Sequence, residues 1–321
     1  MIEVKNISKY YNEKNKDLFY ALNDISFTLK DGEVVSLLGH NGAGKTTLIK
    51  CLSSLLYPSS GVIEWNGCDI YKNIRNYRRQ ISYTLGGERG IYNRLTGREN
   101  IEYLSALKGV FRKQLKEKIN DYVEELEMKE FIDKRAETYS RGMKQKIHLI
   151  YALLLNANII FLDEPTAGMD PISAEKTRNF IKRAVKEEKR TVLITSHIMR
   201  EVEELSDRIM ILFHGSKKFD GDIEYFKKYT TKEIVCNCKL IYSEKSKELI
   251  QSIERQYCIS CNYDMDIDKG EIFLTLMGKS SKELVERYIK QLAEVILDIN
   301  FEQPSLETNY IHYISELEKE G

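Results

Sequence analysis

The pattern of apolar and polar positions predicts an α/β fold over the first two thirds of the chain. Short, mostly apolar runs at Val34–Leu38, Ile159–Leu162 and Thr191–Thr195 predict buried strands. Helical periodicity follows two of them, at Lys45–Leu56 and Ser173–Lys189. Strands that alternate with helices indicate a largely parallel core sheet.

Other parts of this region follow different patterns. Alternation at Ile2–Val4 and Ala21–Leu29 predicts strands of an antiparallel β subdomain. The Asn66-Gly67 pair after a further strand, Val62–Trp65, is typical of a hairpin turn. A charged, helix-like pattern then predicts a helical subdomain at about 92–150.

A second domain is predicted after the polar, lysine-rich segment Asp222–Thr231. Its pattern has the order β-α-β-β-α-β, which is typical of a small ferredoxin-like α+β domain. We therefore divide the chain into domains 1–228 and 229–321. The predicted strands are Glu233–Leu240, Ile259–Ile267, Glu271–Met277 and Val295–Phe301, and the helices are Ser243–Gln256 and Ser280–Glu294.

Composition narrows the choice of partners. The 321 residues include 49 basic and 49 acidic side chains, so no general attraction to nucleic acid is expected.

The most apolar run, Ile147–Leu162, is interrupted by His148, Asn156 and Asn158. A membrane span needs about 20 mostly apolar residues. This run therefore predicts a buried helix followed by a buried strand, and no transmembrane segment is expected.

A glycine-rich segment between the first buried strand and the following helix fits the pattern G-x-x-x-x-G-K-[ST]. Its backbone N–H groups and the helix N-terminus would bind phosphate oxygens. Lys45 would reach the β- and γ-phosphates, and the Thr46 hydroxyl would hold Mg²⁺. The predicted phosphate site comprises Gly39, His40, Asn41, Gly42, Ala43, Gly44, Lys45, Thr46 and Thr47.

Two acids follow the buried strand Ile159–Leu162. Asp163 would contact the Mg²⁺ shell, and Glu164 would polarise the water that attacks the phosphate. Adjacent acids at a strand end can also form a solvated turn, but the glycine-rich loop favours the catalytic interpretation. A GTPase would carry an N-K-x-D segment that binds guanine. The one Asn-Lys pair of the chain, Asn15-Lys16, has no aspartate at the required position, so the segment is missing.

Three further motifs follow a fixed order. Ser140 and Gly142 begin an apolar helix, where they suit an anion or merely cap the helix. The segment Pro165–Pro171 follows the acids, and His197 follows another buried strand. In this order, the motifs closely resemble the ATPase domain of ABC proteins: a P-loop, signature, acid pair, D-loop and switch histidine. The resemblance covers residues 1 to about 228.

The resemblance implies a mechanism and partners. Two ATPase domains, here a homodimer, would clamp each ATP between the P-loop of one and Ser140 and Gly142 of the other. Glu164 would activate water, and His197 would contact the γ-phosphate. Tyr11 matches the aromatic residue that stacks on adenine, with Tyr10 as the alternative. ATP and Mg²⁺ are the expected cofactors. A separate transmembrane permease would hold the chain at the cytoplasmic face of the cell membrane.

The sequence departs from the pattern of the family in two places. In the signature, Tyr139, Arg141 and Met143 stand where the commonest form has leucine, glycine and glutamine. Arg141 would either add positive charge near the nucleotide or face solvent. The glutamine expected after Ile81–Leu85 is missing. Glu88 is the candidate substitute as a metal-linked residue, and a position in a solvated loop is the other interpretation.

Several segments also resemble the ABC-2 export ATPases, including Glu88–Tyr92, Leu95–Asn100 and Pro304–Glu307. This favours an ATPase subunit for export through a separate permease. The alternatives are a soluble ABC ATPase of translation or DNA repair and a regulatory ATP-binding subunit with weak hydrolysis. A zinc site is a weak further hypothesis, because cysteine is also a common core residue. Its four thiols would be Cys236, Cys238, Cys258 and Cys261.

Overall fold

The chain divides into two compact units, Met1–Asp222 and Ile223–Gly321, which we describe separately. The predicted boundary at residue 228 falls inside the first helix of the second unit, α8 (Ile223–Thr230). The computed structural model describes residues 1–11, 18–84, 90–187, 189–230, 233–257, 260–266, 269–279, 290, 292–302 and 305–320, without some side chains in β11 to β14 and the neighbouring helices.

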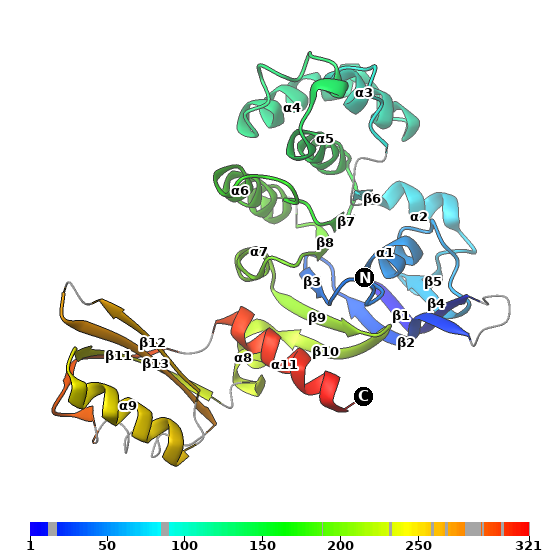
Figure 1. Ribbon diagram of the computed structural model, residues 1–321. Helices are drawn as coiled ribbons and strands as arrows, with labels where there is room; N and C mark the ends of the chain where they lie inside the picture. The colour runs from blue at the N-terminus through cyan, green and yellow to red at the C-terminus, as the bar shows by residue number, and fades with distance from the viewer. Residues whose placement is uncertain are drawn as a thin grey trace. The chain divides into compact units, whose positions relative to one another are not determined.

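A mixed sheet in the order β10-β9-β3-β8-β7-β6 forms the centre of the first unit (Figure 1). Its strands pair in parallel except for β10, which is antiparallel to β9. The mostly parallel core sheet predicted from the buried strands is thereby confirmed. The strands span, in sheet order, Ser216–Asp222, Arg208–Phe213, Val34–Leu38, Thr191–Thr195, Ile159–Asp163 and Ile81–Thr84.

A smaller antiparallel sheet has the order β2-β1-β4-β5. The predicted hairpin turn joins its last two strands: Trp65 pairs with Cys68, and Asn66 and Gly67 have φ angles of 50° and 76°. Positive φ at both central residues is the requirement of a type I′ turn. The strands span Phe19–Leu29, Ile2–Tyr11, Ser60–Trp65 and Cys68–Asp69.

The helix after the glycine-rich loop ends at Leu52, four residues before the predicted end at Leu56. The Ser53 hydroxyl donates to the carbonyl oxygen of Ile49 at 2.7 Å, and Ser54 takes a left-handed φ of 56°. The helices of this unit are α1 (Lys45–Leu52), α2 (Ile74–Gln80), α3 (Gly97–Leu107), α4 (Arg112–Glu125), α5 (Arg141–Leu154), α6 (Pro171–Glu187) and α7 (Met199–Leu205).

Helices α3, α4 and α5 gather at one end of the first unit, away from the antiparallel sheet (Figure 1). Helix α3 begins with a reciprocal capping box between Thr96 and Glu99. Helix α4 meets α6 through an edge contact between Tyr122 and Phe180, whose ring centroids lie 4.8 Å apart. The buried face of α5 joins the same core, so this helix connects the helical region to the central sheet.

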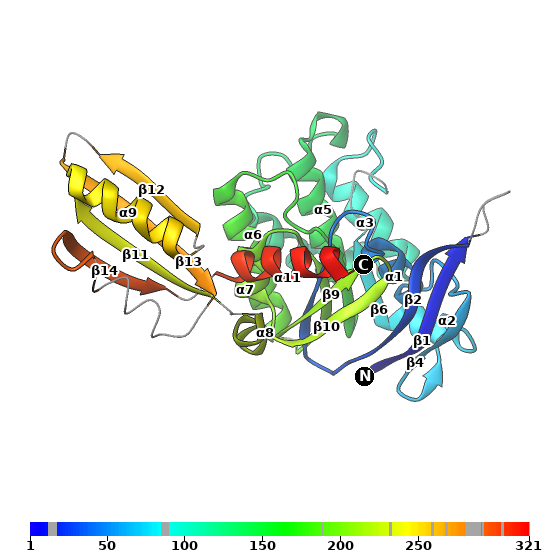
Figure 2. The same cartoon turned by 60° about the horizontal axis from the view of Figure 1, so that its bottom comes forward.

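The second unit contains an antiparallel sheet in the order β12-β13-β11-β14, the order expected of a ferredoxin-like fold. Helix α9 covers one face, where Ile250 packs with Leu240 and Leu274 (Figure 2). The predicted helix Ser280–Glu294 lies largely outside the described residues. The elements are β11 (Glu233–Ile241), α9 (Glu244–Tyr257), β12 (Ser260–Asp266), β13 (Glu271–Lys279) and β14 (Ile296–Glu302).

Helix α8 packs separately against the last helix, α11 (Leu306–Glu320), through the rings of Phe226 and Tyr313, whose centroids lie 5.5 Å apart.

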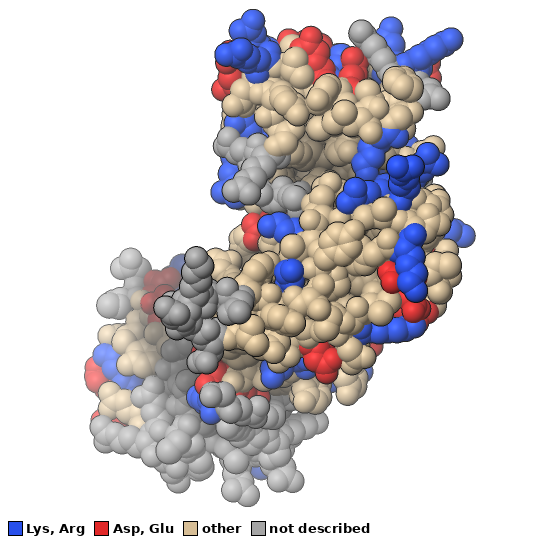
Figure 3. All heavy atoms as spheres, turned by 90° about the vertical axis from the view of Figure 1, so that its right-hand side faces the viewer, with Lys and Arg blue, Asp and Glu red and all other residues tan. Residues whose placement is uncertain are grey.

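Cys238 is buried in β11, and the side chains of Cys236, Cys258 and Cys261 lie outside the described part. Among the residues described, no helix combines the length and the hydropathy needed to cross a membrane. On the face drawn in Figure 3, basic and acidic side chains are interspersed, as the balanced composition suggests.

His148 gives the fold a dependence on pH. It lies on the buried face of α5, and burial lowers the pKa of its imidazole from 6.5 to about 4. The unfolded chain therefore binds a proton between these two pH values that the folded chain does not bind. The stability that a neutral His148 provides is present above pH 6.5 and is lost as the pH falls toward 4.

We expect the free energy of unfolding to fall by about 2 kcal/mol from pH 7 to pH 5 because of this group. Urea unfolding followed by the fluorescence of Trp65, the single tryptophan of the chain, would measure the change. The variant His148→Gln should lack this part of the pH dependence. An equal pH dependence in both proteins would contradict the assignment.

Candidate functional site

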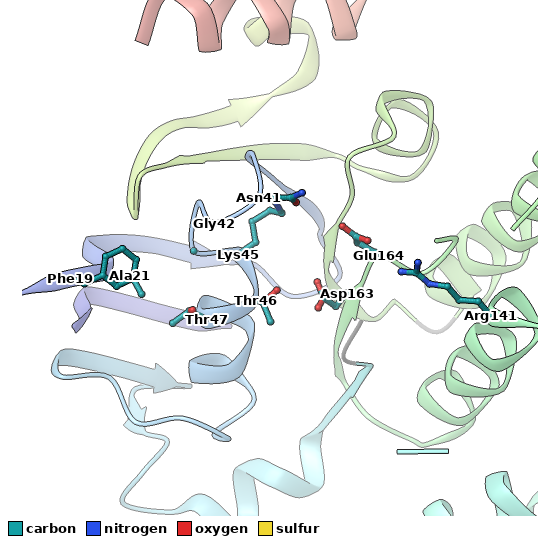
Figure 4. A pocket seen from close by; sticks show the side chains of 11 residues that line it. Phe19, Ala21, Asn41, Gly42, Lys45, Thr46, Thr47, Arg141, Asp163 and Glu164 are labelled. Atoms are coloured by element: carbon teal, nitrogen blue, oxygen red, sulfur yellow. The ribbon is translucent and has the colours of Figure 1, made fainter. Parts of the chain in front are cut away.

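An open cavity of about 530 Å³ lies where β3 and β7 end, beside the glycine-rich loop. Figure 4 shows Lys45 and Thr46 on one wall and Asp163 and Glu164 on the other. Residues from both halves of the predicted site therefore meet in one place. The lining residues are Phe19, Ala21, Asn41, Gly42, Gly44, Lys45, Thr46, Thr47, Arg141, Asp163 and Glu164.

The loop has a conformation that requires glycine at its last position. Gly44 has a φ of 105°, and a Cβ there would lie 2.5 Å from the carbonyl oxygen of Ala21. The Lys45 amine donates to the carbonyl oxygens of Gly39 and His40 at 2.5 and 3.1 Å. Burial lowers the pKa of this amine, and the nearby carboxylates of Glu164 and Asp163 oppose that effect. The Lys45 amine is thus a buried cation held across the glycine-rich loop by two of its carbonyl oxygens.

The back of the loop is held by the hairpin that joins β9 and β10. The Gly215 N–H donates to the carbonyl oxygen of Ala43 at 3.1 Å. The His40 ring packs against Phe213 and His214, with centroids 5.4 and 4.9 Å away. Its side chain is thus placed at the hairpin and is not among those that line the cavity.

The acid pair shares one cavity although its members are consecutive. Successive side chains of a strand point to opposite faces. Glu164 leaves the extended conformation, with a φ of 48°, and so its carboxylate turns into the cavity beside Asp163. Asp163 accepts a hydrogen bond from the Thr195 hydroxyl at 2.5 Å, which fixes the carboxylate at the end of β7.

His197 lies next to the second acid. Its Nδ1 is 3.3 Å from Oε1 of Glu164, and the imidazole is 64% exposed. The residue follows β8, two positions after Thr195. The structure therefore brings the predicted switch histidine to the predicted base.

The oxygen atoms of Thr46 and Asp163 fit the preference of Mg²⁺ for hard oxygen ligands. One is a hydroxyl at the start of α1 and the other a carboxylate at the end of β7, and both line the cavity. Glu88, the other residue named for a metal-linked role, lies outside the described residues.

The signature segment starts α5. Ser140 is the N-cap, and its hydroxyl accepts the Met143 N–H at 3.2 Å. A Cβ on Gly142 would lie 3.0 Å from the carbonyl oxygen of Gly168, so the helix start and the D-loop approach closely. Arg141 lines the cavity, and Figure 4 shows its guanidinium directed toward Glu164. The structure thus favours positive charge at the site over a purely solvent-facing position for this arginine.

The analysis of the sequence missed Phe19. This residue is 56% exposed and lines the cavity, whereas the predicted Tyr11 does not. The two residues pair directly across β1 and β2, and directly opposed residues share one face of a sheet. Only the pairing register, which the sequence does not display, could have pointed to Phe19.

Comparisons with known proteins agree with this geometry. A family model described as ABC transporter matches residues 22–167. The ABC transporter ATP-binding protein NatA of Bacillus subtilis is 38% identical over 224 residues, 70% of this chain and 90% of NatA. The bacitracin transport ATP-binding protein BcrA of Bacillus licheniformis is 29% identical over 319 residues, which cover 98% of this chain and 97% of BcrA.

A solved structure extends the comparison to the fold. It is a dimeric, post-hydrolysis state of an ATP-binding cassette bound to ADP and Pi, with a TM-score of 0.63 and 25% identity. The match covers 69% of this chain and 98% of that protein. The predicted resemblance to ABC-2 type ATPases and the predicted cassette fold are confirmed, and the chain belongs to the family of ABC transporter ATP-binding proteins.

Proposed function

We propose that this chain binds and hydrolyses ATP with Mg²⁺ and thereby powers export through a separate membrane permease. The observation that carries the proposal is the meeting of Lys45, Thr46, Asp163 and Glu164 in one cavity, with His197 beside Glu164. This arrangement supplies a phosphate-binding cation, oxygen ligands for a metal and a carboxylate that can orient water.

Each residue has a distinct role in the proposed reaction. The loop N–H groups and Lys45 would hold the phosphates, and Thr46 and Asp163 would hold Mg²⁺, which when bound neutralises part of the phosphate charge. Glu164 accepts a hydrogen bond from the attacking water and directs it at the γ-phosphorus, in line with the bond to the leaving ADP. His197, whose Nδ1 lies 3.3 Å from the Glu164 carboxylate, would contact the γ-phosphate.

Dimerisation and the membrane partner are further parts of the proposal. Ser140 and Gly142 of a second copy would close the open cavity over the nucleotide. Support comes from the dimeric cassette that this chain resembles. BcrA is named for bacitracin transport, and its similarity covers both units of this chain. The chain would therefore act at the cytoplasmic face of a membrane, attached through its permease, and not as a soluble ATPase of translation or DNA repair.

The variant Glu164→Gln tests the proposed base. We expect kcat for ATP to fall by about 10²- to 10³-fold, because the amide orients water but accepts its proton poorly. The ATP affinity should stay within about twofold, since the phosphate contacts of Lys45 and the loop remain. Phosphate release by the full chain and calorimetric titration with ATP would give the two values.

A matched control is Glu130→Gln, an exposed residue in the segment after α4. This variant should keep the kcat of the unchanged chain. Equal turnover by Glu164→Gln and the unchanged chain would show that another group activates the water.

Co-purification with ribosomes instead of a membrane protein would contradict the transport part of the proposal.

Phe19 and Tyr11 are the candidates that stack on the base of the nucleotide. We expect Phe19→Ala to raise KM for ATP by roughly tenfold, as the loss of one stacking contact is worth about 1–3 kcal/mol. Its kcat should change little, because stacking acts on bound substrate and transition state alike. Tyr11→Ala should have the smaller effect, since Tyr11 does not line the cavity.

Tyr20→Ala is the control for this pair. Tyr20 neighbours Phe19 on β2 and pairs with Tyr10 on the opposite face, where the two rings lie 5.5 Å apart. Steady-state ATPase measurements on the three variants would rank the positions. A larger rise in KM for Tyr20→Ala than for Phe19→Ala would place the base elsewhere.

A further inference from the structure

The backbone at Glu164 is in a conformation that its neighbours oppose. A φ of 48° lies in the left-handed region, which glycine adopts readily and other residues rarely adopt. The next residue is Pro165, and a residue before proline normally stays extended. Such a conformation persists only where surrounding contacts hold it.

Hydrogen bonds hold both ends of this residue. The Glu164 N–H donates to the backbone carbonyl and the hydroxyl of Thr195, each at 3.1 Å. The Glu164 carbonyl accepts the N–H of Ala167 at 3.1 Å, within the turn that follows. The same carbonyl also accepts a hydrogen bond from a side chain far away in the sequence, the Nε2 group of Gln145 at 3.0 Å.

Gln145 is built into the interior to make this contact. Its side chain is 5% exposed and lies on the buried face of α5. Its Nε2 lies 3.4 Å from the Asp163 carbonyl as well. Both partners are carbonyl oxygens, which only accept, so the amide nitrogen must face them. A buried amide needs partners, and this one finds them at the strained turn.

We propose that Gln145 is a positioning residue for ATP hydrolysis: its amide fixes the Glu164 peptide and so the direction in which the Glu164 carboxylate enters the cavity. The inference rests on the proposed function, in which Glu164 orients the attacking water. Gln145 is not among the residues that line the cavity, so it acts through the backbone of the base.

Because Gln145 belongs to α5, its hydrogen bond to Glu164 has a second consequence. The same helix begins at Arg141, directly after Ser140, whose hydroxyl caps it. A shift of α5 along its axis would move the Gln145 amide relative to the Glu164 carbonyl. The helix start that would meet the nucleotide of a second copy is therefore connected to the base of its own chain by one rigid element and one hydrogen bond.

Two replacements without a donor test the inference. Gln145→Met keeps the length of the side chain, and Gln145→Leu shortens it, and neither can donate a hydrogen bond to the carbonyls. In both variants of the full chain we expect kcat for ATP to fall by about tenfold or more, with KM within about twofold. A residue that only supported the core would change stability and KM as well.

The decisive measurement combines Gln145→Met with Glu164→Gln. If Gln145 acts through Glu164, the double variant should turn over within about twofold of Glu164→Gln alone, since the carboxylate it positions is already gone. Single-turnover phosphate release would measure these slow rates. Unfolding followed by Trp65 fluorescence and calorimetric ATP binding would show that each variant is folded and competent to bind.

Gln80→Met is the matched control. Gln80 ends α2, and its side chain accepts a hydrogen bond from Asn158 at 2.8 Å on an exposed surface. This variant loses a side-chain hydrogen bond away from the cavity, and it should keep the unchanged kcat.

The outcomes separate the two proposals. Wild-type kcat in either folded Gln145 variant, beside a slow Glu164→Gln, would overturn the role of Gln145 and leave the proposed function intact. Multiplied losses in the double variant would also overturn it. Full turnover by Glu164→Gln itself would overturn both proposals, because the base would then be another group.

Discussion

The carboxyl ends of β3, β8 and β7 lie side by side at one edge of the central sheet, and the site depends on this alignment. The phosphate loop follows β3, and the acid pair ends β7. Between them, β8 contributes Thr195, whose hydroxyl donates to Asp163. A slip of one residue in the register would turn every side chain of a strand to the other face. The geometry of the cavity is therefore set by strand pairing before any side-chain contact is made.

Charge is the second constraint on this edge of the sheet. Lys45 is a buried cation facing two carboxylates, and they favour its charged form while burial opposes it. A nucleoside triphosphate adds negative charge to this cavity, so further positive charge is needed. Mg²⁺ on Thr46 and Asp163 would supply part of this positive charge. Arg141, which lines the cavity, would supply more. The arginine at position 141, which departs from the commonest signature, therefore has a physical explanation.

Local pattern predicted strands β3, β7 and β8 of the central sheet and the loop that lies beside the cavity, because glycine-rich loops and buried strands have clear sequence patterns. The end of α1 was wrong by four residues, since Ser53 bonds back to Ile49 and Ser54 turns left-handed. Phe19 and Gln145 were missed for a different reason. An exposed phenylalanine in a strand and a glutamine in an apolar helix look ordinary until pairing and packing show what they face.

The β9–β10 hairpin, which contacts the phosphate loop, can transmit force to it. Its second strand, β10, ends at Asp222, and the chain passes directly into the second unit at Ile223. Tension applied at that junction would act on the end of β10 and therefore on its pairing with β9. The hairpin turn carries Gly215, which is bonded to Ala43 of the loop. Force on the accessory unit would thus reach the phosphate loop through the covalent chain, the β9–β10 pairing and the Gly215–Ala43 hydrogen bond.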